Sequence, residues 1–151
     1  MTKRFTLAAT AGLLLSAPVL MAAQAPQAGA DLQVHLTGLR SAKGVVHLCL
    51  SARPDKFLDC KADKTALART VPARAAGRLD LGPVRPGTYA LLIVHDENQN
   101  GKLDMTLGIP REGFGFSNNP AMRPRPPRWE EIRFTMPATP TTQQIRVRYV
   151  L

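Results

Sequence analysis

The stretch that decides the fold is Thr88–His95, which reads TYALLIVH. It is apolar and rich in strand-forming residues, and it follows Pro86-Gly87, a dipeptide typical of turns. A short apolar run bounded by turn signals is typical of a buried strand. We therefore predict a central strand that is covered on both faces.

The flanking sequence predicts more strands. Apolar and polar residues alternate in Leu32–Thr37, and Val45–Leu50 follows a turn over Arg40–Gly44, which together predict a β-hairpin. Helix signals are poor, since only Ala62–Arg69 is a run of good helix formers. Further strand candidates are Leu67–Val71, Arg78–Leu81, Ile132–Met136 and Ile145–Leu151. This pattern predicts an all-β fold, an antiparallel β-sandwich with long irregular loops, of which Leu107–Arg128 is the longest.

Composition sets the class of protein. The chain has 151 residues, enough for one domain, and its hydrophobic content of 44% supports a folded core. Its 13 Pro and 11 Gly exclude long helices. The net charge is +9, but aromatic residues make up only 5%, so there are few stacking platforms for single-stranded nucleic acid. We expect no nucleic-acid partner.

The first residues have the pattern of a secretory signal peptide. Lys3 and Arg4 precede the uncharged apolar stretch Phe5–Leu20, and small residues follow up to Ala30. We expect residues 1–30 to be a signal peptide and short linker and residues 31–151 to be a single β-sandwich domain, periplasmic or secreted. The apolar run is too short for a confident membrane span, although an uncleaved anchor is the alternative.

Two cysteines, Cys49 and Cys60, remain in the expected mature chain. Outside the cytoplasm such a pair is usually oxidised, and the chain has no C-x-x-C spacing of a redox pair. We predict a structural disulfide, which would stabilise the fold by about 3 kcal/mol on the chain-entropy model.

The acidic stretch after the central strand matches positions 1, 3, 5, 7 and 9 of a calcium loop, with Gly101 at the sharp turn of position 6. The ligands at these positions would be Asp96, Asn98, Asn100, the main-chain carbonyl of Lys102, and Asp104. Alternate residues of a curling loop point their oxygens inward, and Ca²⁺ takes six to eight oxygens.

The match to a calcium loop ends at position 12. Leu107 stands there in place of a bidentate carboxylate, although Glu112 can supply the missing oxygen if the chain folds back. We therefore expect at best a weak Ca²⁺ site, with an affinity of about 10⁻⁴–10⁻³ M. The alternative is a hairpin tip in which Asx side chains bond their own main chain and Asn100-Gly101 forms the turn.

Two other sites are candidates. His95-Asp96 and the loop Gly113–Asn119 could serve a hydrolase or a small-molecule-binding protein, but no nucleophile elbow surrounds Ser117, so we expect a protein that is not an enzyme. The Pro-rich segment favours polyproline II and could bind an anionic envelope component such as lipid or polysaccharide. Its arginines are Arg123, Arg125 and Arg128.

Two longer strings resemble a known family. They are His95-Asp96-x-Asn98-x-Asn100-Gly101-Lys102-Leu103-Asp104 and Gly108-Ile109-Pro110-x-Glu112-Gly113-Phe114-Gly115-Phe116-Ser117-Asn118-Asn119. Both are similar to the domain-of-unknown-function 2141 family of small exported bacterial proteins. The resemblance implies an exported β-sandwich domain without an established activity. From the signal peptide and the acidic loop we expect a non-catalytic module with an envelope-associated binding or structural role.

A shorter string resembles other sandwiches at the level of the fold only. Leu81-Gly82-x-Val84-x-Pro86-Gly87-Thr88-Tyr89 is similar to the turn and strand of transthyretin-like and carboxypeptidase-regulatory-like domains. This implies an Ig-like or transthyretin-like sandwich and says little about function.

Overall fold

The structure is a computed structural model, and it describes residues 28–151. The predicted signal peptide and linker, residues 1–30, lie outside these residues apart from the last three. The strands are β1 (Ala30–Thr37), β2 (Val45–Ser51), β3 (Leu67–Pro72), β4 (Arg78–Val84), β5 (Gly87–Asp96), β6 (Met105–Thr106), β7 (Ile109–Pro110), β8 (Gly113–Phe116), β9 (Phe134–Met136) and β10 (Thr141–Arg146). The helices are a 3-10 turn (Ala73–Ala75) and α1 (Trp129–Ile132).

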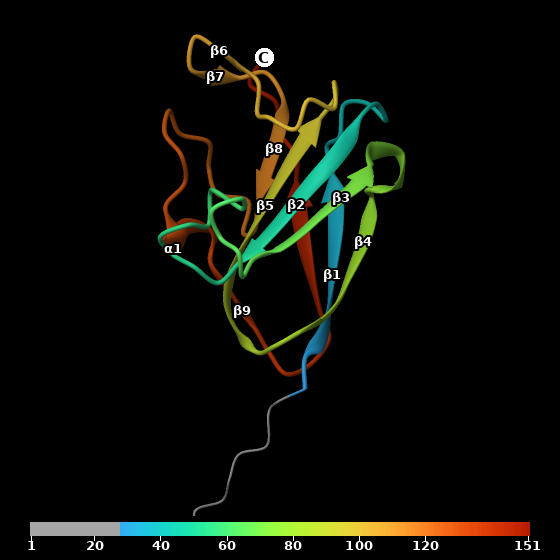
Figure 1. The fold of residues 1–151 in the computed structure, drawn as a ribbon, viewed down its shortest axis with the longest axis vertical. Helices are drawn as coiled ribbons and strands as arrows, with labels where there is room; N and C mark the ends of the chain where they lie inside the picture. Colours follow the sequence, from blue (N-terminus) through green and yellow to red (C-terminus); the bar gives the residue numbers. More distant parts are fainter. Residues whose placement is uncertain (1–27) are drawn as a thin grey trace, which may run out of the picture.

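Two sheets face each other, as predicted for an all-β sandwich (Figure 1). One has the order β10-β1-β4, and the other has the order β3-β2-β5-β8, with β9 paired to the start of β5. All pairs in the two sheets are antiparallel except β1 with β10, which is parallel. The short hairpin β6–β7 stands apart from both sheets.

The central strand is placed as predicted, but it is covered unequally on its two faces. Leu91 and Ile93 of β5 are fully buried between the sheets, whereas Leu92 and Val94 on the opposite face are only half-buried. The core between the sheets gathers inward-facing side chains from every long strand. Its fully buried members include Leu32, Val34, Val46, Leu91, Ile93 and Ile145.

The predicted hairpin of Leu32–Thr37 with Val45–Leu50 is wrong. Both segments are strands, but β1 pairs with β4 and β10, and β2 pairs with β3 and β5. The connection crosses from one sheet to the other because each strand buries one apolar face in the same core. Gly44 permits the crossing, since its φ is +71° and a Cβ there would overlap the main chain of Asp96 and Glu97.

Other boundaries also differ from the predictions. Leu107–Arg128, expected to be an irregular loop, contains β7 and β8, because residues 113–116 pair with β5. Ala62–Arg69 forms turns and then enters β3, because Asp63 holds this turn by side-chain hydrogen bonds. Ile132–Met136 divides into the end of α1 and β9, and the last strand begins at Thr141 and ends at Arg146.

A second, smaller cluster lies apart from the main core. It joins Phe57, Ala90 and Ile132, with Phe116 and Trp129 packed against them. The phenyl ring of Phe57 meets the indole of Trp129 edge-on, with ring centroids 5.6 Å apart. This cluster packs the β2–β3 connection and α1 against the start of β5. The acidic loop follows the other end of β5 (Figure 1).

Candidate functional site

The acidic loop leaves the sandwich at Asp96, the last residue of β5, and the chain returns to β8 through Glu112. Between these two residues it forms the loop and the β6–β7 hairpin, at the end of the molecule where the C-terminus also lies (Figure 1). The chain therefore does fold back, which is the condition under which Glu112 was expected to reach the loop.

Asp96 is the buried anchor of the loop. Its side chain has no exposed surface, its Oδ1 accepts the Asn100 N–H at 3.2 Å, and its Oδ2 accepts the Gly101 N–H at 2.7 Å. The Nε2 atom of His47 lies 3.1 Å from the same Oδ2. Burial raises the pKa of this carboxyl, but the Gly101 and Asn100 N–H groups and His47 outweigh burial, so the pKa lies below its ordinary value.

The remaining loop side chains converge on Asp104. The amide groups of Asn98 and Asn100 donate to its two carboxylate oxygens at 2.7 and 2.8 Å. The amide oxygens of the same two residues accept the N–H groups of Asn100 and Lys102 at 3.1 and 2.8 Å. Asn98, Asn100 and Asp104 thus form one hydrogen-bonded ring, and the Asp96 side chain joins it only through the Asn100 N–H.

Glu112 closes this ring from the returning strand. It is only 4% exposed, and its Oε2 accepts the Asp104 N–H at 3.3 Å. Its Oε1 is buried and accepts no hydrogen bond from an N–H or hydroxyl group of the described residues. Burial is the largest cause of a raised pKa at Glu112. The Asp104 N–H lowers this pKa, whereas the charges of Asp96 and Asp104 and a hydrogen bond between the Glu112 and Asp96 carboxyl groups raise it.

The unpartnered oxygen separates the two interpretations of the loop. Asx side chains do bond their own main chain, as the turn interpretation predicts, and these bonds account for Asp96, Asn98 and Asn100. They leave Glu112 Oε1 without an N–H or hydroxyl partner among the described residues, and the contact between the Glu112 and Asp96 carboxyl groups is costly unless they share a proton or a cation. Leu107, at position 12 of the calcium pattern, is 98% exposed.

A cation at this position would depend on neutral oxygens as well as carboxylates. Within residues 28–151, no three side chains among His, Cys, Asp and Glu are grouped closely enough to hold a metal ion by themselves. The available oxygens are those of two amides and one main-chain carbonyl beside the carboxylates. This donor set, all oxygen, suits Ca²⁺ or Mg²⁺ and no soft metal.

His47 is a part of the site that the sequence analysis missed. Its Nδ1 lies 2.8 Å from Thr70 Oγ1 on β3, which fixes the ring while Nε2 faces Asp96. The register of β2 against β5 brings it there, because Val45 lies opposite Asp96 and His47 lies opposite Val94. No local pattern around His47 signals this contact, which depends on strand pairing.

Arg40 supports the loop from a distant part of the chain. Its Nε donates to Glu97 Oε2 at 2.9 Å, and its guanidinium carbon lies 4.3 Å from the ring centroid of Tyr149. Its Nη1 also donates to the carbonyl of Leu151 at 2.7 Å. The Arg40 hydrogen bond is the largest cause of a lowered Glu97 pKa, so this carboxylate is paired and is no spare ligand for a cation.

The residues of the hydrolase interpretation make structural contacts instead. His95 is fully buried, with Nδ1 2.6 Å from the Tyr149 hydroxyl and Nε2 2.8 Å from the Lys43 carbonyl. Ser117 is also fully buried; its hydroxyl donates to the Ile132 carbonyl and accepts a main-chain N–H. Neither group is free to attack or to deprotonate a substrate in this arrangement.

Glycines that the hydrolase interpretation placed in a binding loop have a packing role. Gly113 and Gly115 of β8 face inward, where a Cβ would overlap Tyr149 and Val147 at the first and Ile145 at the second.

The three arginines of the Pro-rich segment are not equivalent. Arg125 forms a two-pronged ion pair with Glu131, at 2.9 and 2.7 Å. The Nε of Arg123 lies 3.9 Å from Glu131, and the Arg128 N–H donates to the same carboxylate. The Arg125 hydrogen bond is the main reason that the pKa of Glu131 falls to about 2. Arg125 is thereby engaged, whereas Arg123 and Arg128 have exposed side chains, of which Arg123 also lies at ion-pair distance from Glu131.

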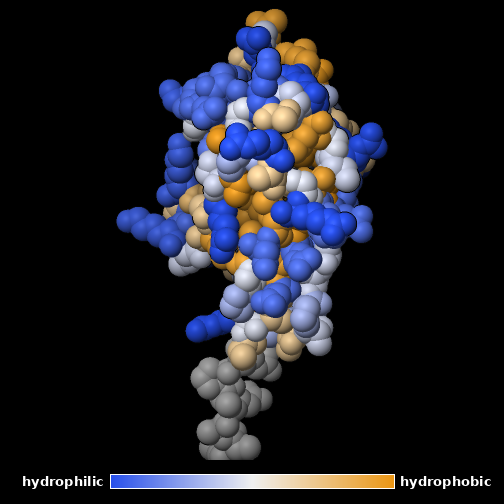
Figure 2. Space-filling model, turned by 90° about the vertical axis from the view of Figure 1, so that its right-hand side faces the viewer, coloured by the Kyte–Doolittle hydropathy of each residue, from blue (hydrophilic) through white to orange (hydrophobic). Residues whose placement is uncertain are grey.

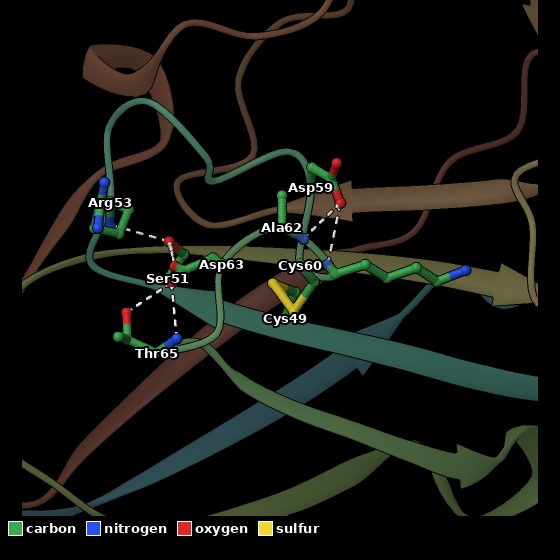
Figure 3. Close-up of a disulfide and its surroundings, with 9 residues drawn as sticks. Cys49, Ser51, Arg53, Asp59, Cys60, Ala62, Asp63 and Thr65 are labelled. Atoms are coloured by element: carbon green, nitrogen blue, oxygen red, sulfur yellow. Dashed lines mark hydrogen bonds between the residues drawn. A yellow bond between two sulfur atoms is a disulfide. The ribbon is translucent and has the colours of Figure 1, made fainter.

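The predicted cysteine pair is joined. Cys49 on β2 and Cys60 in the β2–β3 connection form a disulfide with a Cα–Cα distance of 5.8 Å (Figure 3). Beside it, Asp63 accepts the Ser51 hydroxyl at 2.5 Å and the Thr65 hydroxyl at 2.6 Å. The disulfide and this buried carboxylate together hold the connection.

A small cavity lies between β3 and β4, and no residue of the acidic loop lines it. Its volume is about 120 Å³, and apolar core residues line it together with Arg69 and Arg78. Figure 2 looks onto this side and shows hydrophobic atoms framed by hydrophilic ones.

No helix within residues 28–151 has the length and hydrophobicity needed to cross a membrane.

The comparisons with known proteins give one match. The family described as "Uncharacterized protein conserved in bacteria (DUF2141)" matches residues 34–144, which include the acidic loop, Glu112 and both cysteines. No curated protein and no solved structure matches the chain. The match covers most of the sandwich, and the chain belongs to the DUF2141 family.

Proposed function

We propose that this chain is an exported, non-catalytic β-sandwich module of the bacterial envelope that binds Ca²⁺ where the acidic loop meets Glu112. Export is inferred from the charged and apolar pattern of residues 1–30. The single observation that carries the calcium part is the buried Glu112 carboxyl group, which lies beside two other carboxyl groups and whose Oε1 accepts no hydrogen bond from an N–H or hydroxyl of the described residues.

The donor set favours Ca²⁺ over Mg²⁺. The oxygens come from residues of one curling loop and from a strand that returns to it, so their arrangement is irregular and adjustable. Ca²⁺ accepts six to eight oxygens in such an arrangement, whereas Mg²⁺ demands a near-ideal octahedron. The oxygens that would hold the ion belong to Asp96, Asn98, Asn100, the Lys102 carbonyl, Asp104 and Glu112.

A cation would change two features of this region. It would give Glu112 Oε1 the partner that it lacks, and it would replace the amide N–H groups of Asn98 and Asn100 as the partners of Asp104. Both changes tie the loop to the strand that follows it. The free energy of unfolding of such a module is higher in a calcium-rich medium outside the cytoplasm than in the presence of a chelator.

The test uses protein recovered from the envelope after expression of the full chain. Calcium binding is measured by titration calorimetry, and the melting temperature is measured in EGTA and in about 10 mM CaCl₂, well above the expected dissociation constant. This concentration is about 10 to 100 times the expected dissociation constant, so binding should add about 1.4–2.7 kcal/mol to the free energy of unfolding. The same concentration of MgCl₂ should give a much smaller shift.

Glu112→Gln is the decisive variant, because the amide keeps the size of the side chain and removes its charge. It should weaken calcium binding at least about tenfold, since a carboxylate ligand is lost. In EGTA, the free energy of unfolding of this variant should equal or slightly exceed that of the wild type, because a buried, unpaired charge is removed. Glu130→Gln, at an exposed position two residues before α1 ends, is the matched control and should bind Ca²⁺ like the wild type. Absence of binding heat and of a melting shift in the wild type would refute the proposal.

A further inference from the structure

The β6–β7 hairpin presents apolar side chains to solvent. Leu107 at its tip is 98% exposed and Met105 is 51% exposed, while Leu103 and Ile109 are 40% and 38% exposed. Neither hydrophobic cluster of the described residues includes any of the four. The hairpin projects from the end of the molecule (Figure 1), and Figure 2 shows hydrophobic atoms at that same end.

The tip residue is unusual for its backbone conformation. Leu107 and Gly108 have φ values of +50° and +79°, which is the pattern of a two-residue hairpin turn with both residues left-handed. Asn-Gly or Asp-Gly is the ordinary choice for such a turn, because Asn and Asp tolerate positive φ and are hydrated. Leucine satisfies neither requirement, so its presence at the tip is not explained by the fold.

Cationic side chains surround the base of the hairpin. Lys102 and Arg111 are exposed on the segments that enter and leave it, and Lys61 Nζ donates to the Gly101 carbonyl at 3.3 Å. These three cations balance the three carboxyl groups of the candidate site. A bound Ca²⁺ would add two positive charges, so the base would become cationic when the site is loaded.

We propose that the β6–β7 hairpin, in the calcium-loaded protein, docks onto an anionic lipid bilayer, with Leu107 entering the boundary between headgroups and acyl chains. This inference rests on the calcium site proposed above. An apolar tip above a cationic base matches the order of layers in such a surface, where the apolar boundary lies beneath anionic headgroups. The local charge therefore complements this partner only when calcium is bound.

The hairpin has the dimensions of an interfacial anchor. Its pairing is limited to Met105 with Pro110 and Thr106 with Ile109, so the main chain beyond these pairs needs water or headgroups as partners. It can therefore enter the interface but not the hydrocarbon centre. A convex tip of this kind also suits a deformable bilayer better than a flat protein surface.

The candidate site controls the base of the hairpin. The Arg111 N–H donates to the Asp104 carbonyl at 2.9 Å, and the Asp104 N–H donates to Glu112. These contacts join the two segments that carry the hairpin. A cation shared by Asp104 and Glu112 would hold both segments, and with them the orientation of the tip.

The test is co-sedimentation with vesicles of phosphatidylglycerol and phosphatidylcholine in equal parts, in CaCl₂ and in EGTA, with calcium binding measured in parallel by calorimetry. Leu107→Asn is the key variant, because Asn suits the left-handed turn and removes only the apolar tip. Leu58→Asn, at a leucine that is 41% exposed in the β2–β3 connection, is the control. All three proteins share the same N-terminus, so any effect of that segment cancels.

We expect the wild type and Leu58→Asn to bind the vesicles in calcium and to lose at least about tenfold in affinity in EGTA. Leu107→Asn should lose about tenfold in calcium, as removal of one interfacial leucine predicts, and should keep its calcium affinity. Calorimetry can show calcium binding while the wild type does not bind vesicles, or while Leu107→Asn binds them as well as the wild type does. In either case the docking inference is wrong and the calcium site stands. If no calcium binds, both proposals are wrong. If Leu107→Asn abolishes self-association in sedimentation velocity and vesicle binding is absent, a second copy of the chain covers the tip, and the lipid proposal is overturned.

Discussion

The β2–β3 and β5–β8 connections are both irregular and both contain a buried carboxylate, yet they differ in how completely their groups are partnered. In the first, Asp63 is 3% exposed and accepts two hydroxyls and an N–H, and Phe57 is packed in the small cluster. In the second, Glu112 is 4% exposed with one oxygen unpartnered, and Leu107 is exposed. In the first connection the buried carboxylate is fully partnered, whereas in the second one carboxylate oxygen lacks an N–H or hydroxyl partner among the described residues and the tip leucine is exposed.

The largest effect should come from opening the disulfide of the first connection. Replacing both Cys49 and Cys60 by Ser should lower the free energy of unfolding by about 3 kcal/mol, because the unfolded chain regains the entropy of a short closed loop. Urea unfolding of the double variant measures this. Calcium binding should be unchanged, since none of the proposed ligands belongs to the first connection, which reaches the acidic loop through the exposed Lys61–Gly101 hydrogen bond. A double variant that loses calcium binding while still folded would show that the two connections are coupled.

Asp96→Asn should have the next largest effect. The Gly101 and Asn100 N–H groups and His47 share the buried carboxylate, and an amide cannot accept from all of them. We expect a loss of about 1–3 kcal/mol in EGTA, the usual cost of an unsatisfied buried polar group, together with loss of calcium binding. Asp80→Asn is the matched control, because the Asp80 carboxylate also accepts an N–H but is exposed. Equal melting temperatures for both variants would contradict the anchoring role of Asp96.

The smallest effect concerns pH and the first connection. Hydrogen bonds from the Ser51 and Thr65 hydroxyls hold the pKa of Asp63 at about 2, below its usual value of 3.8. Its contribution to stability is therefore present above about pH 4 and is lost as the pH falls toward 2. Asp63→Asn should flatten the fall of the melting temperature in this window, whereas Asn at the exposed Asp31 should not. An unchanged pH profile for Asp63→Asn would show that the hydroxyls do not hold the carboxylate.

Features that short stretches of sequence encode could be predicted, whereas features that depend on pairing between distant strands could not. The turn Pro86-Gly87, the strand that follows it and the oxygen spacing of the loop are local patterns, and the structure shows the strand and the converging side chains. The disulfide could also be predicted, because only two cysteines are present. Alternation in Leu32–Thr37 predicted a strand but carried no information about its partner. The hairpin with Val45–Leu50 was therefore wrong.

The parts of the site that were missed all depend on long-range pairing. His47 reaches Asp96 through the register of β2 on β5, and Arg40 reaches Glu97 and Tyr149 from a turn between the two sheets. No spacing along the chain encodes these contacts. Glu112 could be proposed from sequence only on the condition that the chain folds back, and the β6–β7 hairpin is what meets that condition.

The most direct measurement of the central claim is a crystal structure of the protein grown in calcium, with the anomalous signal used to locate the ion. The account predicts an ion about 2.3–2.6 Å from the Glu112 carboxylate, with further oxygens from Asp96 and the loop asparagines. A loop that keeps its amide-to-Asp104 hydrogen bonds in calcium, with no ion beside Glu112, would contradict it.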